Sequence, residues 1–201
     1  GFSSAAFLIL ATILAKNSHI VLENIGLNPT RIGFLKILEM MGADIKTTID
    51  QNQFEPYGTI EIKSSQLHGI NVPKYLIPLS IDELPLVFLA AACAKGKTTV
   101  RNADELRLKE SDRIKSMKTT LTEFSINVVE HKDGLTIEGG TITGGEIDSF
   151  GDHRIAMTAL IASVCSKDDV LVKNTKNIDT SFPDFVEVMN SAGLNIQRLD
   201  N

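Results

Sequence analysis

One pattern occurs three times along the chain: an apolar helical run, a break and then a strand-like segment. The three apolar runs are AAFLILATILA, LPLVFLAAACA and IAMTALIASV. In each copy a second helical pattern and a second strand pattern follow, and the first two copies add a short strand, GTIEIKSS and GLTIEGG. Such a repeat confines the chain to architectures that stack copies of one supersecondary unit.

Each copy predicts the order α-β-α-β, which a leading strand would extend to a βαβαββ unit. The segment INVPKYLIPLS at 70–80 could supply that strand to the second copy and GEIDSF at 145–150 to the third, whereas the first copy has none. Alternating helices and strands predict an α/β fold with sheets covered by helices. We expect one pseudo-threefold domain over residues 1–201, with repeat units at about 1–70, 71–143 and 144–201.

Capping signals indicate where the second helix of each copy should begin. In the first copy we expect Asn28 as the N-cap and Pro29 at the first helical position. Ser111 is the expected cap in the second copy, and Pro183 should lie early in the helix of the third. A last strand is then expected after this helix, within SFPDFVEVMNSAGLNIQRL at residues 181–199.

Composition excludes several classes of protein. The hydrophobic content of 43% is globular, and no apolar run is long enough to span a bilayer. With a net charge of −5 and no basic stripe, nucleic acid is not an expected partner. Cys93 and Cys165 lie near the ends of apolar runs, so we interpret them as small buried residues in a reducing cytoplasm, not as a disulfide framework. The chain starts at Gly1 and enters a helix almost at once, which indicates a piece of a longer protein.

Two arginines are placed against the electrostatics of the helices that carry them. Arg113 in KESDRI and Arg154 in GDHRI fall in first helical turns, where the positive helix end disfavours a cation. Ion pairs within a charged turn could explain either arginine alone. An anionic ligand explains both, because a helix N-terminus and a guanidinium can bind the same phosphate or carboxylate.

Two aspartates hold matching positions in the repeat. Asp82 and Asp152 stand at the starts of equivalent helices, and each could simply be an N-cap. A carboxylate beside a bound anion could instead act as a base toward a hydroxyl. If the units pack symmetrically, their helix N-termini should point toward a common face.

At these motifs the sequence closely resembles the 5-enolpyruvylshikimate-3-phosphate (EPSP) synthase family. The resemblance rests on LRLKESDRI and GDHRIAM, together with SSAAF, NPTRIGF and SFPDF in the family's order. It covers nearly the whole chain but only the C-terminal of the family's two domains. It implies two domains of three βαβαββ units each. It also implies transfer of the enolpyruvyl group of phosphoenolpyruvate to the 5-hydroxyl of shikimate 3-phosphate, with release of phosphate, in the shikimate pathway of aromatic amino acid biosynthesis.

The resemblance implies a base and a proton donor. Asp82 matches the aspartate that contacts the shikimate hydroxyls and is the favoured base for the 5-hydroxyl. Lys109 matches a lysine beside the shikimate moiety and the reacting centre. Glu110 matches the glutamate proposed to move a proton at the phosphoenolpyruvate methylene. No metal or organic cofactor is implied.

Two anion clamps are implied as well. Arg113 and Arg154 match the arginines that bind phosphoenolpyruvate, and His153 matches the neighbouring active-site histidine. Some members have a further phosphoenolpyruvate-binding lysine where this chain has Thr180, and a shikimate-contacting asparagine where it has Glu105. We therefore expect no third clamp.

The absent N-terminal domain should supply most contacts to shikimate 3-phosphate. We expect this chain to provide half of the active site and to be inactive alone. Three alternatives stay open: a UDP-N-acetylglucosamine 1-carboxyvinyltransferase, an RNA 3′-phosphate cyclase built from similar units, and a non-catalytic binding fragment. The first needs a reactive loop cysteine, and the second needs a basic RNA-binding face that the acidic pI of about 5.4 disfavours.

Overall fold

The computed structural model describes residues 2–28, 32–51 and 55–199. The helices are α1 (Phe2–Leu14), α2 (Gly33–Met40), α3 (Leu84–Cys93), α4 (Arg113–Glu123), α5 (His153–Ile161), α6 (Lys176–Ser181) and α7 (Phe185–Ser191). The strands are β1 (His19–Gly26), β2 (Asp44–Gln51), β3 (Tyr57–Lys63), β4 (Lys97–Val100), β5 (Asn127–His131), β6 (Gly134–Glu138), β7 (Gly145–Asp148) and β8 (Val170–Lys173). Short 3₁₀ helices are η1 (Lys74–Leu76), η2 (Ile81–Glu83), η3 (Asp104–Leu108) and η4 (Ala162–Val164).

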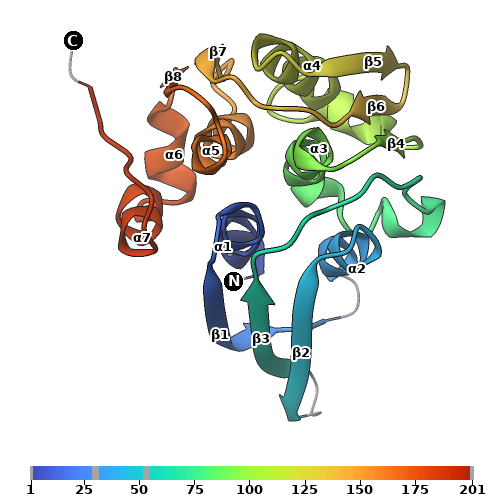
Figure 1. Ribbon diagram of the computed structural model, residues 1–201, viewed down its shortest axis with the longest axis vertical. Coiled ribbons are helices and arrows are strands. Elements are labelled where there is room, and N and C mark those ends of the chain that lie inside the picture. Colours follow the sequence, from blue (N-terminus) through green and yellow to red (C-terminus); the bar gives the residue numbers. More distant parts are fainter. Residues whose placement is uncertain (1, 29–31, 52–54, 200–201) are drawn as a thin grey trace.

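Two three-stranded sheets repeat one topology. The first has the order β1-β3-β2 and the second β4-β6-β5, so in both the last strand of the copy pairs antiparallel between the two before it. The third sheet contains only β7 and β8, which run parallel. Figure 1 shows the sheets on the outside, with α1, α3 and α5 side by side between them. The predicted α/β class with repeated units is confirmed; the exact unit boundaries remain a prediction.

The opening strand expected at 70–80 is largely absent. The chain makes only two isolated parallel bridges there, His68 to Lys95 and Asn71 to Thr99. Pro73 follows, which has no backbone N–H for a ladder, and the chain then enters η1. By contrast, the strand expected at 145–150 is present as β7.

The prediction of a last strand in the third copy, after its second helix, is also wrong. Residues 194–199 form no strand within the described part of the chain. In the sheets of the first and second copies, the last strand lies between the two earlier strands. Among the described residues, no such strand lies beside β8. Instead, the Asn190 side chain forms hydrogen bonds with both backbone groups of Ile196. Its Oδ1 accepts from the Ile196 N–H at 2.7 Å, and its Nδ2 donates to the Ile196 carbonyl at 3.0 Å.

Helix starts were predicted less well than the helices themselves. The N-cap of α2 is Ile32, not Asn28, so the helix begins four residues later than expected; Pro29 lies outside the described residues. In the third copy, Pro183 lies in the turn before α7, whose N-cap is Asp184. A proline signals that a helix is near but tolerates several positions at its edge.

The cap of α4 is Asp112, not Ser111. The Asp112 carboxylate accepts a hydrogen bond of 3.1 Å from the backbone N–H of Lys115. The Ser111 hydroxyl is not available for this role, because it donates to the Asp152 carboxylate at 2.8 Å. A contact from another repeat thus displaces the local cap that the sequence suggested.

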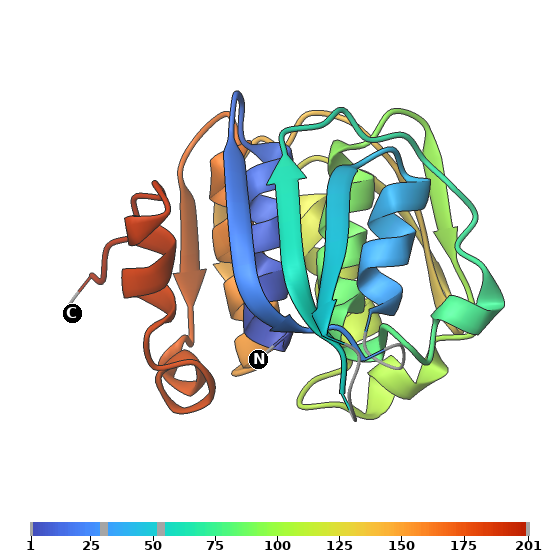
Figure 2. The same ribbon diagram turned by 90° about the horizontal axis from the view of Figure 1, so that it is seen from below.

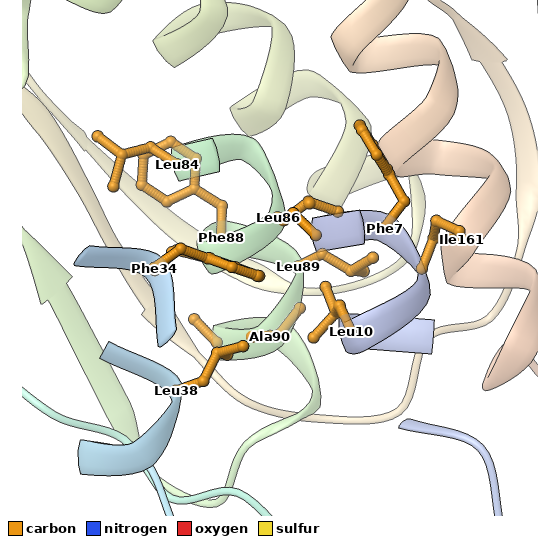
Figure 3. Packing of buried hydrophobic residues seen from close by; sticks show 14 of the residues in the cluster. Phe7, Leu10, Phe34, Leu38, Leu84, Leu86, Phe88, Leu89, Ala90 and Ile161 are labelled. Carbon is orange, nitrogen blue, oxygen red and sulfur yellow. The ribbon is translucent and has the colours of Figure 1, made fainter. Parts of the chain in front are cut away.

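The hydrophobic core is one cluster that draws on all three repeats. Every residue from Leu84 to Ala92 in α3 is buried, as expected for a helix that is apolar all round. Figure 3 shows Leu10 of α1 and Phe34 of α2 directed at this central helix. In the view of Figure 2 the β1-β3-β2 sheet covers one side of the helical layer. Among the described residues, no helix combines the length and apolarity needed to cross a membrane.

Candidate active site

The N-terminal ends of three helices meet at one face. Asp82 lies in η2, which leads into α3; Arg113 is the first residue of α4, and His153 is the first residue of α5. Figure 1 looks roughly along these neighbouring helices. Arg113 links all three ends, because its Nε lies 2.9 Å from Asp152 and its Nη1 3.9 Å from Asp82. The predicted common face is therefore present in the second and third repeats.

Arg113 and Asp152 form a buried ion pair. The guanidinium donates to both carboxylate oxygens, Nε to Oδ2 at 2.9 Å and Nη2 to Oδ1 at 3.2 Å. The side chains are only 5% and 0% exposed. The Asp152 carboxylate also accepts from the backbone and hydroxyl of Ser111 and caps α5 through the N–H of Arg154. Five hydrogen bonds thus compensate the buried charge, and they fix the orientation of the guanidinium.

These contacts lower the pKa of Asp152. Burial on its own raises the pKa, but the hydrogen bonds and charge of Arg113, with the bonds from Ser111 and Arg154, outweigh it. Because the folded-state pKa is below the unfolded one, the stabilisation is complete above the unfolded value. It is lost as the pH falls through the folded value.

We therefore expect the difference in melting temperature between the protein and its Asp152→Asn variant to depend on pH. The gap should be constant at neutral pH, where the carboxylate is ionised in both folded and unfolded chains. It should shrink as the pH falls below about 4, the ordinary carboxyl range. Thermal unfolding followed by circular dichroism from pH 8 to pH 3 measures it. A gap that stays constant over the whole range would contradict this linkage.

An exposed carboxylate lies between two cations on the open side of the site. Asp82 Oδ1 is 3.7 Å from Lys109 Nζ and 3.9 Å from Arg113 Nη1, and its side chain is 49% exposed. Lys109 Nζ also lies 3.4 Å from Glu105. Solvent can reach this carboxylate, so a substrate hydroxyl could approach it.

A second group of contacts joins Glu110 to the third repeat. His153 Nδ1 lies 2.5 Å from Glu110 Oε2, and the backbone N–H of His153 donates to Glu110 Oε1 at 3.3 Å. Asn177 in α6 donates to the same Oε1 at 2.7 Å. The sequence reasoning missed Asn177. It stands four residues after the end of β8 in no recognisable motif, and only the packing of α6 against α5 places it here.

Arg154 also contacts Asp82. Its Nη1 donates to the backbone carbonyl of Asp82 at 3.3 Å, and its side chain is half-buried. All six predicted site residues therefore gather at one face: Asp82, Lys109, Glu110, Arg113, His153 and Arg154. Thr180 is exposed on α6 and offers no cation.

The arrangement can hold an anion more readily than a metal ion. Ligand atoms of Glu110, Asp152 and His153 lie within 4.8 Å of one another, which is close enough to share a cation. The Asp152 oxygens are, however, already occupied by five hydrogen bonds. Two guanidinium groups, a lysine and three helix N-termini instead concentrate positive charge around an exposed carboxylate.

Comparison with known proteins adds an independent line of evidence. The model of the family described as EPSP synthase (3-phosphoshikimate 1-carboxyvinyltransferase) matches residues 2–189. A curated 3-phosphoshikimate 1-carboxyvinyltransferase of Legionella pneumophila (strain Corby) is 50% identical over 190 residues, which cover 94% of this chain and 44% of that protein. One from Nitrosococcus oceani is 46% identical over 198 residues, covering 97% and 44%. The chain spans a little under half the length of these relatives.

Solved structures show the same fold. An EPSP synthase from Acinetobacter baumannii superposes with a TM-score of 0.93 at 42% identity, over 98% of this chain and 46% of that one. The enolpyruvyl transferase NikO from Streptomyces tendae superposes with a TM-score of 0.72 at 16% identity, over 96% and 43% of the two chains. The second likeness concerns the fold alone.

Proposed function

Because the chain belongs to the EPSP synthase (3-phosphoshikimate 1-carboxyvinyltransferase) family, we propose that it forms half of the active site of such an enzyme. The complete protein would transfer the enolpyruvyl group of phosphoenolpyruvate to the 5-hydroxyl of shikimate 3-phosphate and release phosphate, as a cytoplasmic step toward aromatic amino acids. The observation that carries the proposal is the convergence of Asp82, Arg113 and Arg154, from two repeats, at one face.

Arg113 and Arg154 would bind the phosphoenolpyruvate anion. Arg113 uses Nε and Nη2 for Asp152, which leaves Nη1, 3.9 Å from Asp82 Oδ1, for an anion. Arg154 contacts the same residue through its backbone carbonyl. Phosphoenolpyruvate carries a carboxylate and a phosphate, and a guanidinium suits either group.

The carboxylates would move the protons. Asp82 is exposed enough to take the proton of the 5-hydroxyl. The positive charge of the adjacent Lys109 would stabilise negative charge at this position. Glu110 would protonate the phosphoenolpyruvate methylene, which gives the adjacent carbon cationic character for attack by the 5-oxygen. The contacts of Glu110 with His153 and Asn177 hold it in place for this step.

The rest of the site would come from the domain that the relatives have in addition. The relatives are about twice as long as this chain, and closure of two domains would exclude water and strengthen every electrostatic contact. We therefore expect the 201-residue chain by itself to show no enolpyruvyl transfer. Its partners in the reaction would be the two small-molecule substrates and the other domain.

Calorimetric titration of the full-length protein tests the proposed function. We expect binding of shikimate 3-phosphate, and of phosphoenolpyruvate in its presence. Tight binding of UDP-N-acetylglucosamine without binding of the shikimate ester would refute the proposal in favour of the sister enzyme. The cysteines already weigh against that alternative, since Cys93 is the last residue of α3 and Cys165 follows η4 after α5, at the ends of these helices away from the site.

Replacing Arg154 by alanine in the full-length enzyme should raise the KM for phosphoenolpyruvate. Loss of a charge-assisted contact to an anion corresponds to about a 10- to 100-fold change. Steady-state rates with varied phosphoenolpyruvate measure it. Arg101→Ala is the matched control, because Arg101 is a half-exposed arginine paired with Asp133 outside the site. An unchanged KM in Arg154→Ala would mean that this residue is not a clamp.

A further inference from the structure

The two cysteines of the chain meet in the fold. Cys93 is the last residue of α3, and Cys165 directly follows η4 at the end of α5. Their Sγ atoms lie 3.4 Å apart, although 72 positions separate them in the sequence. Both thiols are free and half-buried, so each retains some access to solvent. The sequence suggested small buried residues and gave no indication that they are neighbours.

The repeat explains why they meet. Cys93 and Cys165 stand near the ends of equivalent helices in the second and third copies, in ACAKG and VCSKD. Because α3 and α5 pack side by side, equivalent positions near their ends come together. A disulfide has an S–S length of about 2.05 Å, so closure needs a movement of about 1.4 Å. Cys165 lies outside regular helix, with φ −123° and ψ 4°, and its loop can supply that movement.

The two thiols also differ in the direction of their pKa shifts. The hydrogen bond between the two sulfur atoms raises the pKa of Cys93, which burial raises further. The same hydrogen bond lowers the pKa of Cys165. Cys165 lies outside regular helix after η4 whereas Cys93 ends α3, so Cys165 is the sulfur that a small disulfide should reach first.

We infer that Cys93 and Cys165 form a reversible redox site, which a small disulfide of the glutathione type oxidises to an intramolecular disulfide between the second and third repeats. The Cys165 thiolate attacks one sulfur of the oxidised glutathione, forms a mixed disulfide and releases one glutathione thiolate. Cys93 then loses its proton to solvent and attacks the Cys165 sulfur, which releases the second glutathione thiolate. Both released thiolates take up protons, so two protein thiols and one glutathione disulfide give one protein disulfide and two glutathione thiols.

The test is oxidation of the folded full-length protein with oxidised glutathione, followed by alkylation and tryptic digestion. Cleavage after Lys74 and Lys95 gives peptide 75–95, and cleavage after Arg154 and Lys167 gives peptide 155–167. We expect these peptides to appear linked, at the sum of their masses less two hydrogens, and to separate on reduction. The melting temperature of the oxidised protein should rise by about 5–10 °C, since a disulfide that closes a long loop constrains the unfolded chain.

Cys93→Ser and Cys165→Ser are the matched controls. Each should yield no linked peptide, and the remaining thiol should keep its glutathione because no second thiol can displace it. The inference fails if the folded protein gives no linked peptide, or gives one only in urea. It also fails if oxidation lowers the melting temperature, which would mean that the fold must be distorted before the sulfurs can join. None of these outcomes depends on enolpyruvyl transfer, so the site and the proposed function are tested separately.

Discussion

Replacing Asp82 by asparagine should lower kcat of the full-length enzyme about 10²- to 10⁴-fold, the range in which general bases contribute. Asparagine keeps the shape of the side chain but cannot accept a proton. The Asp82 backbone carbonyl, which receives the Arg154 hydrogen bond, is not changed. The loss should therefore appear mainly in turnover, with a smaller change in the KM for phosphoenolpyruvate.

The fold of this variant should be intact. The Asp82 side chain is 49% exposed, and its cations are 3.7 and 3.9 Å away, so its ion pairs contribute little to stability. Asp104→Asn is the matched control, because Asp104 is an exposed aspartate in the nearby η3. Steady-state rates and melting temperatures of both variants should be compared. A kcat within tenfold of the unmodified enzyme would remove Asp82 from the role of base.

Replacing Asp152 by alanine should cost about 3–5 kcal/mol of folding free energy, the largest stability effect we expect from a single substitution in the site. The substitution leaves the Arg113 guanidinium buried, with 5% exposure, and without its carboxylate. It also removes the cap of α5 and the acceptor for Ser111. Urea unfolding followed by circular dichroism measures the loss.

A double variant separates the buried charge from the other contacts. Arg113→Met combined with Asp152→Ala removes both charges and fills the space with an apolar side chain, so it should recover a substantial part of the loss. Asp148→Ala is the control, since the Asp148 carboxylate is exposed and accepts from Asn174 and Phe150. Its loss should be about 1 kcal/mol. If the double variant is as unstable as Asp152→Ala alone, the unpaired guanidinium is not the cause.

The helices and most strands could be predicted because their signals are local. The apolar runs that became α1, α3 and α5 are hydrophobic over their whole length, and β3, β6 and β7 appear where short strand patterns were expected. The repeat led us to expect helix N-termini at a common face, and Asp82, Arg113 and Arg154 do lie together at such ends. The repeat relates positions that are distant in sequence, and local propensity cannot do this.

The pairing within the site could not be predicted in the same way. Asp152 was expected as a cap, and it is one, but it is also the carboxylate that receives Arg113. Asp152 thus compensates part of the unfavourable interaction between Arg113 and the positive helix end, and Nη1 lies 3.9 Å from Asp82. Asn177 was missed because its contact with Glu110 depends on how α6 packs. These are contacts between repeats, and no periodicity within one repeat encodes them.

The third sheet, with two strands, is narrower than the other two sheets, so the three repeats should differ in their resistance to local unfolding. Its parallel pair β7-β8 lacks the antiparallel strand that stands beside β1 and β4 in the other sheets of the described chain. A two-stranded ribbon holds its backbone amides less firmly than a wider sheet. Local unfolding should therefore cost the least free energy in the third repeat. This is the repeat that supplies His153, Arg154 and Asn177. A strand supplied from outside this chain along the open edge of β8 would stiffen this side of the site without touching a substrate.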